Sequence, residues 1–103
     1  MDLALAGKRA IVTGGTGGIG IAIARQLALE GVHTAVCSRS LQRATDAIAS
    51  LGLGGDAELM PVQVELKDPA SVAAMVAAVA ARWGGVDIVV NSAAEVKIGR
   101  AHV

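Results

Sequence analysis

Between Thr13 and Gly20 the sequence reads TGGTGGIG, a turn built mostly of glycine. An apolar, β-branched run precedes this turn, and apolar residues at helical spacing follow it, which predicts a strand, a turn and a helix. The first turn of a helix has free N–H groups and a positive dipole end that favour a phosphate, and glycines let the backbone approach that phosphate closely. We therefore interpret the segment as a dinucleotide-binding turn rather than as a merely flexible one.

The elements that must position this turn alternate along the chain. Strands are expected near 9–13, 32–37, 59–64 and 86–91, and helices near 18–30, 40–51 and 69–83. This alternation predicts an α/β fold of the Rossmann type, in which a doubly wound parallel sheet has helices on both faces. Right-handed crossovers then give the strand order 3-2-1-4. We expect a half-domain over residues 1–94 and a tail of uncertain order over 95–103.

Composition narrows the class of protein. The chain has 103 residues, 53% hydrophobic and 17% charged, with nine basic side chains of Lys and Arg balancing nine acidic ones. This balance gives no reason to expect nucleic acid or a membrane as a partner. The single Cys37 excludes an internal disulfide and fits a reducing compartment, so the cytoplasm is the expected location. No cluster of His, Cys and Asp has the spacing of metal ligands.

Four segments in sequence resemble the short-chain dehydrogenase/reductase family. TGGTGGIG resembles its TGxxxGxG signature, VCSRS closes the second strand, VELKDPASV follows the third, and GGVDIVVNSAA is similar to the fourth strand with its NNAG motif. The resemblance covers nearly the whole chain up to Ala94. It implies hydride transfer between a nicotinamide dinucleotide and a carbonyl or alcohol. It also implies these cofactor-binding residues: Gly14, Thr16, Gly17, Gly18, Ile19, Gly20, Ser38, Arg39, Glu65, Leu66, Asn91 and Ala93.

The end of the second strand bears on which cofactor is bound. Ser38 stands roughly 20 positions past the glycines, where an acidic residue would bind the ribose 2′-hydroxyl of NAD. Arg39 follows, and its guanidinium suits a 2′-phosphate, so NADP(H) is expected to be preferred over NAD(H). The alternative is that Arg39 is a solvated surface charge. Gly17 stands where many NADP-using relatives carry a basic residue.

At other positions the sequence departs from the family motifs or allows two interpretations. Thr13 either hydrogen-bonds within the turn or simply ends a strand. Glu65 replaces the Asp that bonds the adenine amino group, and Leu66 either packs against the adenine or belongs to the core. Asn91 would lie under the adenosine side of the cofactor and tie strands together. Ser92 and Ala94 replace the second Asn and the Gly of NNAG.

Several polar residues are expected to have no chemical role. His33 is predicted to be packed in a strand and Cys37 to be a small buried hydrophobe. Asp87 and His102 are assigned no chemistry. The Tyr, Lys and Ser that the family uses for catalysis lie downstream of NNAG, and this sequence contains no Tyr. The resemblance therefore implies the N-terminal, cofactor-binding segment of an oxidoreductase, without catalytic residues and inactive by itself.

Two further expectations concern a chain without catalytic residues: its alternative function and its association with other chains. The alternative function is a non-catalytic nucleotide-binding or interaction module, or the product of a decayed gene. The fourth strand, VDIVVN, has high β-propensity and one charge, so it is expected to be an unprotected edge. We expect it to pair with a complementary fragment or to cause self-association.

Overall fold

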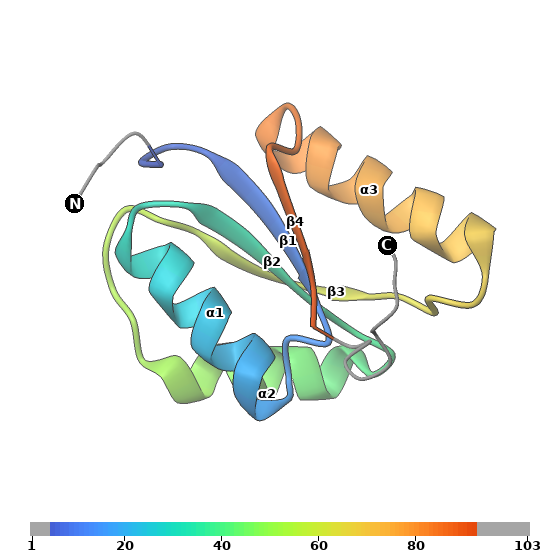
Figure 1. Cartoon of the computed structure of the whole chain (residues 1–103), viewed down its shortest axis with the longest axis horizontal. Helices are drawn as coiled ribbons and strands as arrows, with labels where there is room; N and C mark the ends of the chain where they lie inside the picture. Colours follow the sequence, from blue (N-terminus) through green and yellow to red (C-terminus); the bar gives the residue numbers. More distant parts are fainter. Residues whose placement is uncertain (1–4, 93–103) are drawn as a thin grey trace.

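The computed structural model describes residues 5–92, so the expectations for Ala93, Ala94, His102 and the tail over 95–103 lie outside the described residues. Four strands and three helices alternate: β1 (Arg9–Thr13), α1 (Gly18–Leu29), β2 (His33–Ser38), α2 (Leu41–Leu51), β3 (Leu59–Gln63), α3 (Pro69–Trp83) and β4 (Ile88–Asn91). All strand pairs are parallel, in the order β3-β2-β1-β4 (Figure 1). The predicted Rossmann-type topology is confirmed.

Some boundaries differ from the prediction by one or two residues. The N–H of Val32 bonds to the carbonyl of Leu27, so Val32 closes the end of α1 and β2 begins one residue later. β4 begins at Ile88 rather than at 86, because its pairing with β1 starts at Ala10 and Ile88. Ser40 is the N-cap of α2 rather than its first residue.

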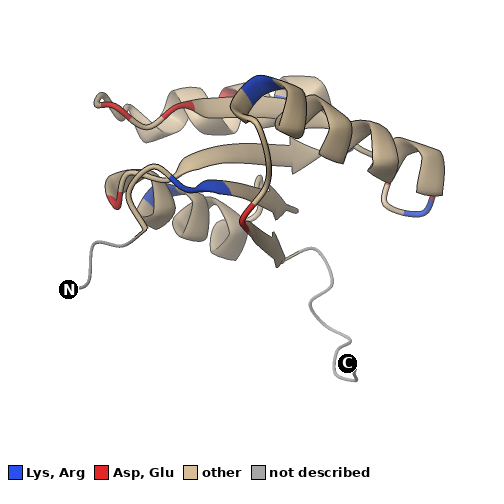
Figure 2. Ribbon diagram, turned by 90° about the horizontal axis from the view of Figure 1, so that it is seen from above, with Lys and Arg blue, Asp and Glu red and all other residues tan. Residues whose placement is uncertain are grey.

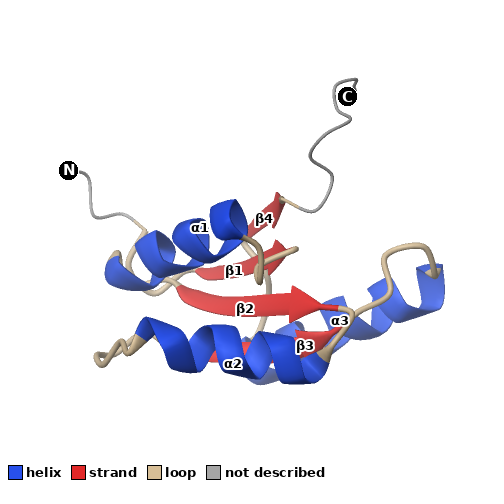
Figure 3. Ribbon diagram, turned by 90° about the horizontal axis from the view of Figure 1, so that it is seen from below, coloured by secondary structure: helices blue, strands red, loops and turns tan. Residues whose placement is uncertain are grey.

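The sheet has one hydrophobic core on each face. Alternate residues of β1 point to opposite sides: Ile11 packs in a cluster with Met75 and Val79 of α3, and Val12 packs with Ala24 of α1 and Ala44 of α2. Helices α1 and α2 therefore cover one face and α3 the other (Figures 1 and 3). This two-sided burial explains why the central strands are apolar almost throughout.

The three helices differ at their N-termini. Ser40 caps α2 by accepting a bond from the N–H of Arg43, and Asp68 caps α3 by accepting one from Ala70. Helix α1 begins after Gly17 with no side-chain cap and no acidic residue in its first turn. Its first N–H groups, which have no partner inside the helix, are thus left to other acceptors.

The edge where the strands begin is held by polar contacts. Arg9 forms an ion pair with Asp87 at 2.8 Å. The Nε1–H of Trp83 donates to a Glu58 carboxylate oxygen at 2.9 Å, and His33 stacks on Trp83 with its Nδ1 accepting from the Glu58 N–H. His33 is packed, as predicted, and these contacts stabilise the end of the sheet opposite the glycine turn.

Helix α3 has a single charged residue, Arg82, so its ribbon is almost entirely tan in Figure 2. With 15 residues, α3 is the longest helix in the described part of the chain. None of the helices described over residues 5–92 combines the length and the apolar character that crossing a membrane requires.

Candidate cofactor-binding site

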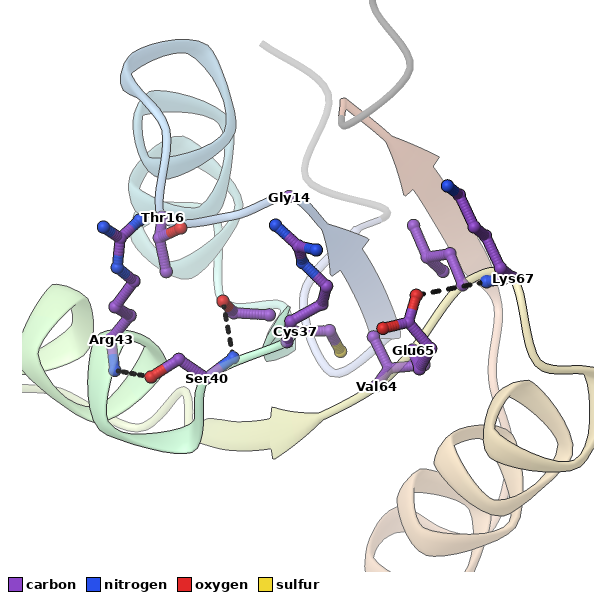
Figure 4. A pocket seen from close by; sticks show the side chains of 11 residues that line it. Gly14, Thr16, Cys37, Ser40, Arg43, Val64, Glu65 and Lys67 are labelled. Atoms are coloured by element: carbon purple, nitrogen blue, oxygen red, sulfur yellow. Dashed lines mark hydrogen bonds between the residues drawn. The ribbon is translucent and has the colours of Figure 1, made fainter.

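The carboxyl ends of the strands meet at one edge of the sheet. Thr13 is in register with Cys37 of β2 and with Asn91 of β4, and Ser38 is in register with Gln63 of β3. A hollow of about 680 Å³ opens at this edge (Figure 4). It is lined by Gly14, Thr16, Cys37, Ser38, Arg39, Ser40, Arg43, Val64, Glu65, Leu66 and Lys67. Segments far apart in the sequence therefore form one concave site.

The glycines of the turn have different structural roles. Gly14 has a φ of 72°, a conformation that residues with a Cβ rarely adopt. A Cβ on Gly20 would collide with the Gly14 carbonyl oxygen and lie 2.6 Å from Ser92 Oγ, so the start of α1 packs directly on the turn. Gly18 has no other atom within 4 Å of the position of a Cβ. Gly18, unlike Gly20, thus leaves open space where a ligand could approach the helix.

The N-terminus of α1 is the exposed end of the site. The side chain of Ile19, in the first turn, is 75% exposed. Gly17 N–H bonds to the Gly14 carbonyl, and Ile21 N–H bonds back to Gly17, which holds the turn against the helix. The uncapped helix end, with its positive dipole, is therefore presented at the same edge as the hollow and favours an anion there.

The loop after β2 is held in place by its own hydrogen bonds. Ser40 N–H donates to Ser38 Oγ at 3.2 Å, and Gln63 Nε2 donates to the Arg39 carbonyl at 3.2 Å. Arg39 lines the hollow, so its position fits an anion-binding role better than that of an isolated surface charge.

Three cations line the hollow together with one carboxylate. Sequence reasoning identified Arg39 but missed Arg43 and Lys67, which the fold brings to the same cavity. The one carboxylate, on Glu65, lies 3.5 Å from the Lys67 N–H (Figure 4). Three positive charges and one negative charge leave an excess of two positive charges, which suits a phosphate-rich ligand. The sequence signal for Arg43 was a second Arg four residues after Arg39.

The residues after β3 resolve one open alternative. Val64 is buried, whereas Leu66 is 41% exposed and lines the hollow, so Leu66 is not a core residue. Ser71 Oγ accepts a 2.8 Å hydrogen bond from Glu65 N–H, which fixes the backbone where Glu65 and Leu66 present their side chains. An apolar side chain exposed in this hollow is suited to packing against an aromatic base.

The end of β4 is joined to the glycine turn. Thr13 Oγ1 donates to Asn91 Oδ1 at 3.0 Å, so Thr13 bonds across to β4 rather than within the turn, and Asn91 ties two strands together. Ser92 Oγ donates to the carbonyls of Thr13 at 2.8 Å and of Gly14 at 3.2 Å. Ser92 therefore has a positioning contact that the motif comparison did not predict.

Cys37 lies at the inner wall of the hollow, but its side chain is buried. Burial raises the pKa of the Cys37 thiol to about 12, so the sulfur stays protonated and unreactive, as expected of a small buried hydrophobe. Among residues 5–92 no group of His, Cys, Asp and Glu side chains is arranged to hold a metal ion.

The structure thus brings six of the expected cofactor-binding residues to the hollow itself: Gly14, Thr16, Ser38, Arg39, Glu65 and Leu66. The others lie around it, in the turn, at the start of α1 and at the end of β4: Gly17, Gly18, Ile19, Gly20 and Asn91. Sequence reasoning also missed Ser40, which caps α2 at the rim.

Known proteins are similar to this chain over most of its length. A family model described as short chain dehydrogenase matches residues 8–102. A putative ketoacyl reductase of granaticin polyketide synthase from Streptomyces violaceoruber is 45% identical over 85 residues, covering 82% of this chain and 30% of that protein. The (+)-neomenthol dehydrogenase of Arabidopsis thaliana is 38% identical over 89 residues, 84% of this chain and 30% of that protein.

The fold is similar to solved structures as well. An L-sorbose reductase from Gluconobacter frateurii, complexed with NADPH and L-sorbose, superposes with a TM-score of 0.81 at 35% identity, covering 100% of this chain and 38% of that one. Actinorhodin polyketide ketoreductase with NADPH has a TM-score of 0.73 at 36% identity. The match covers 82% of this chain and 32% of that one. The chain therefore spans about a third of the length of each of these four relatives.

Proposed function

The chain belongs to the short-chain dehydrogenase/reductase family, and on that premise we propose that it is the NADP(H)-binding portion of an oxidoreductase acting on a carbonyl or alcohol. The observation that carries the proposal is the hollow at the carboxyl ends of the strands, where Arg39 lies at the end of β2 and the uncapped start of α1 is at the same edge. Bound there, NADP(H) would supply the hydride of the reaction.

The residues present fit the parts of this cofactor. Gly18 and Ile19 would meet the pyrophosphate through the backbone N–H groups at the start of α1. Leu66 would pack against the adenine, with Glu65 beside it. Asn91 and Ala93 would complete the adenosine side, Ala93 by the family resemblance alone.

Preference for NADP(H) rests on charge. Ser38 and Arg39 stand where an NAD-binding site would need a carboxylate for the ribose 2′-hydroxyl. The excess positive charge of the hollow would attract a 2′-phosphate instead. Two structural relatives were solved with NADPH, which supports the same preference.

We propose that the 103-residue chain does not itself transfer hydride. The family resemblance implies a Tyr as the general acid/base, and the sequence contains none. A nucleotide-binding module without catalysis is the second candidate. The cytoplasmic location expected from the single Cys37 stays a prediction.

The edge of β4 supports a proposal about partners. Val89 is in register with Ile11, whose side chain is covered by α3, yet Val89 is 65% exposed. Among the described residues β4 pairs with β1 alone. We propose that another strand pairs with this edge, supplied either by a complementary fragment or by a second copy of the chain.

Calorimetric titration of the chain with NADPH and with NADH tests the proposed function. Tighter binding of NADPH supports it. Absence of binding to either nucleotide, in a chain shown to be folded by circular dichroism, would overturn it.

A further inference from the structure

We propose that Arg43 is a specificity-determining residue of the nucleotide site, where it binds the ribose 2′-phosphate together with Arg39. The inference rests on the proposed function and adds to it a residue that neither the sequence motifs nor the comparisons identify. Four observations support it: the place of Arg43 in the hollow, the absence of an ion pair to Arg43 or Arg39 within the described residues, the position of Arg43 in the helix, and the lack of other charge from the glycine turn.

Arg43 reaches the hollow from the first turn of α2. It lines the cavity together with Arg39, Ser40 and Thr16. In Figure 4 its side chain extends from α2 toward Thr16 in the turn before α1. A ligand anion at this rim would thus meet one guanidinium from the loop after β2 and a second from α2.

In the described part of the chain no ion pair neutralises these two cations, and the carboxylate of the hollow, on Glu65, accepts from the Lys67 N–H. The ion pairs formed within residues 5–92 join Arg9 to Asp87 and Arg82 to Glu58, and neither includes Arg39 or Arg43. Asp46, one turn further along α2, accepts a hydrogen bond from Gln42 instead. Two guanidinium groups that line one hollow without an ion pair favour a doubly charged phosphate there.

The position of Arg43 in the first turn of α2 does not favour the stability of the helix. It is the third residue of α2, and its N–H bonds to the Ser40 cap. A Glu at this position would complete a capping box and complement the positive end of the helix dipole. A cation there opposes the dipole, and the first turn of α2 contains no acidic residue to offset it. A bound anion would interact favourably with both the helix end and Arg43.

The glycine turn supplies no charge of its own to this rim, since its contributions to the hollow are Gly14 and Thr16. Lys67, the third cation, follows β3, beside Glu65 and Leu66 at the proposed adenine site. Arg43 is therefore the side chain best placed to share the 2′-phosphate with Arg39.

The test compares nucleotides that differ by this one phosphate. The full 103-residue chain is titrated with NADPH and NADH, and with adenosine 2′,5′-bisphosphate and adenosine 5′-monophosphate. We expect Arg43→Gln to weaken the two 2′-phosphorylated ligands by about ten- to a hundredfold and to leave the other two unchanged. Arg43→Lys should recover part of the loss. Arg25→Gln, which removes an exposed charge of α1 outside the hollow, is the matched control and should change none of the four affinities.

A stability measurement separates this role from a structural one. Arg43→Glu should raise the melting temperature of the unliganded chain, because it completes the capping box with Ser40, while it removes the preference for NADPH. A purely structural Arg43 would instead lower the melting temperature when replaced and weaken NADPH and NADH alike, and that result would overturn the assignment.

The remaining outcomes are also decisive. A chain that prefers NADPH and loses this preference in Arg39→Gln but not in Arg43→Gln overturns the role of Arg43 and leaves the proposed function intact. A wild-type chain that binds all four nucleotides without regard to the 2′-phosphate, or binds none, overturns both.

Discussion

The guanidinium of Arg9 holds the carboxylate of Asp87 across 78 residues of sequence, with Nε donating to Oδ2 at 2.8 Å and Nη2 donating to Oδ1 at 3.1 Å. The backbone N–H of Arg9 donates to Oδ2 as well, at 3.0 Å. The pair joins the start of β1 to the residue before β4. It thereby sets the register of the edge strand whose far end, at Asn91 and Ser92, contacts the glycine turn.

This pair predicts a pH dependence of stability. Arg9 lowers the pKa of Asp87 from 3.8 to about 2, so the native state favours the carboxylate. A carboxylate whose pKa is lowered by folding stabilises the folded chain at pH values above its pKa in the unfolded chain. This stabilisation is lost as the pH falls through its pKa in the folded chain. We expect the stability advantage of wild type over Asp87→Asn to be constant above about pH 4 and to disappear between about pH 4 and pH 2. Urea unfolding at a series of pH values measures it. Asp56→Asn, at an exposed loop position, is the control; an equal pH dependence there would contradict the assignment to Asp87.

Arg39→Asp should reverse the cofactor preference. The substituted carboxylate would repel a 2′-phosphate and accept a hydrogen bond from a ribose 2′-hydroxyl. Loss of the charged contact should cost about 1.5–3 kcal/mol, roughly ten- to a hundredfold in NADPH affinity. Calorimetry with both cofactors measures the change, with Arg25→Asp as the control. Equal affinity of the wild-type chain for NADPH and NADH would refute the charge argument.

Gly18 and Gly20 should respond differently to substitution. The Cβ of Gly18→Val would lie in open space, so we expect the fold to remain while the side chain blocks the approach of the pyrophosphate and abolishes binding of both cofactors. Gly20→Ala would press against the Gly14 carbonyl and Ser92, and should destabilise the chain by about 1–3 kcal/mol. Thermal unfolding and cofactor titration of the two variants test this division. Unimpaired NADPH binding by Gly18→Val would argue against a pyrophosphate at this helix end.

The isolated chain should not oxidise NADPH in the presence of carbonyl compounds. The sequence has no Tyr to serve as the general acid/base that the family resemblance implies. Absorbance of NADPH over a panel of ketones and aldehydes measures the reaction. Gly18→Val purified in the same way controls for contaminating reductases, and carbonyl-dependent turnover in wild type but not in this variant would show that the chain catalyses the reaction.

The chain should associate through β4. Val89 is exposed on an unprotected edge strand, and a charge on such a strand discourages pairing with another strand. We expect Val89→Lys to shift sedimentation toward the monomer. Val76→Lys, at an exposed apolar position of α3, should shift it less. A wild-type chain that sediments as a monomer and has slow amide exchange over residues 88–91 would contradict the proposal.

The sequence by itself determined the order and type of the elements. Local signals carry that information: short apolar, β-branched runs for the strands, helical spacing of apolar residues for the helices, Asp68 and Pro69 at the start of α3, and glycines at left-handed helix ends such as Gly84. Right-handed crossovers then leave few ways to arrange the strands, so the sheet order followed as well. The site residues of the glycine turn and of the β2 end could be named because the segments that resemble the family's motifs stand at the ends of these elements.

Tertiary structure decided the rest, because the relevant contacts join residues that no local pattern connects. The sequence around Leu66 is compatible with a place in the core or in the hollow, and in the folded chain Leu66 is 41% exposed and lines the hollow. Thr13 bonds to Asn91 because parallel pairing brings two strand ends together. Arg43 looks like one more charge on an amphipathic helix until the fold sets the first turn of α2 beside the glycine turn. Spacing along the chain predicts which elements form, whereas the convergence of side chains on one hollow depends on how those elements are arranged in space.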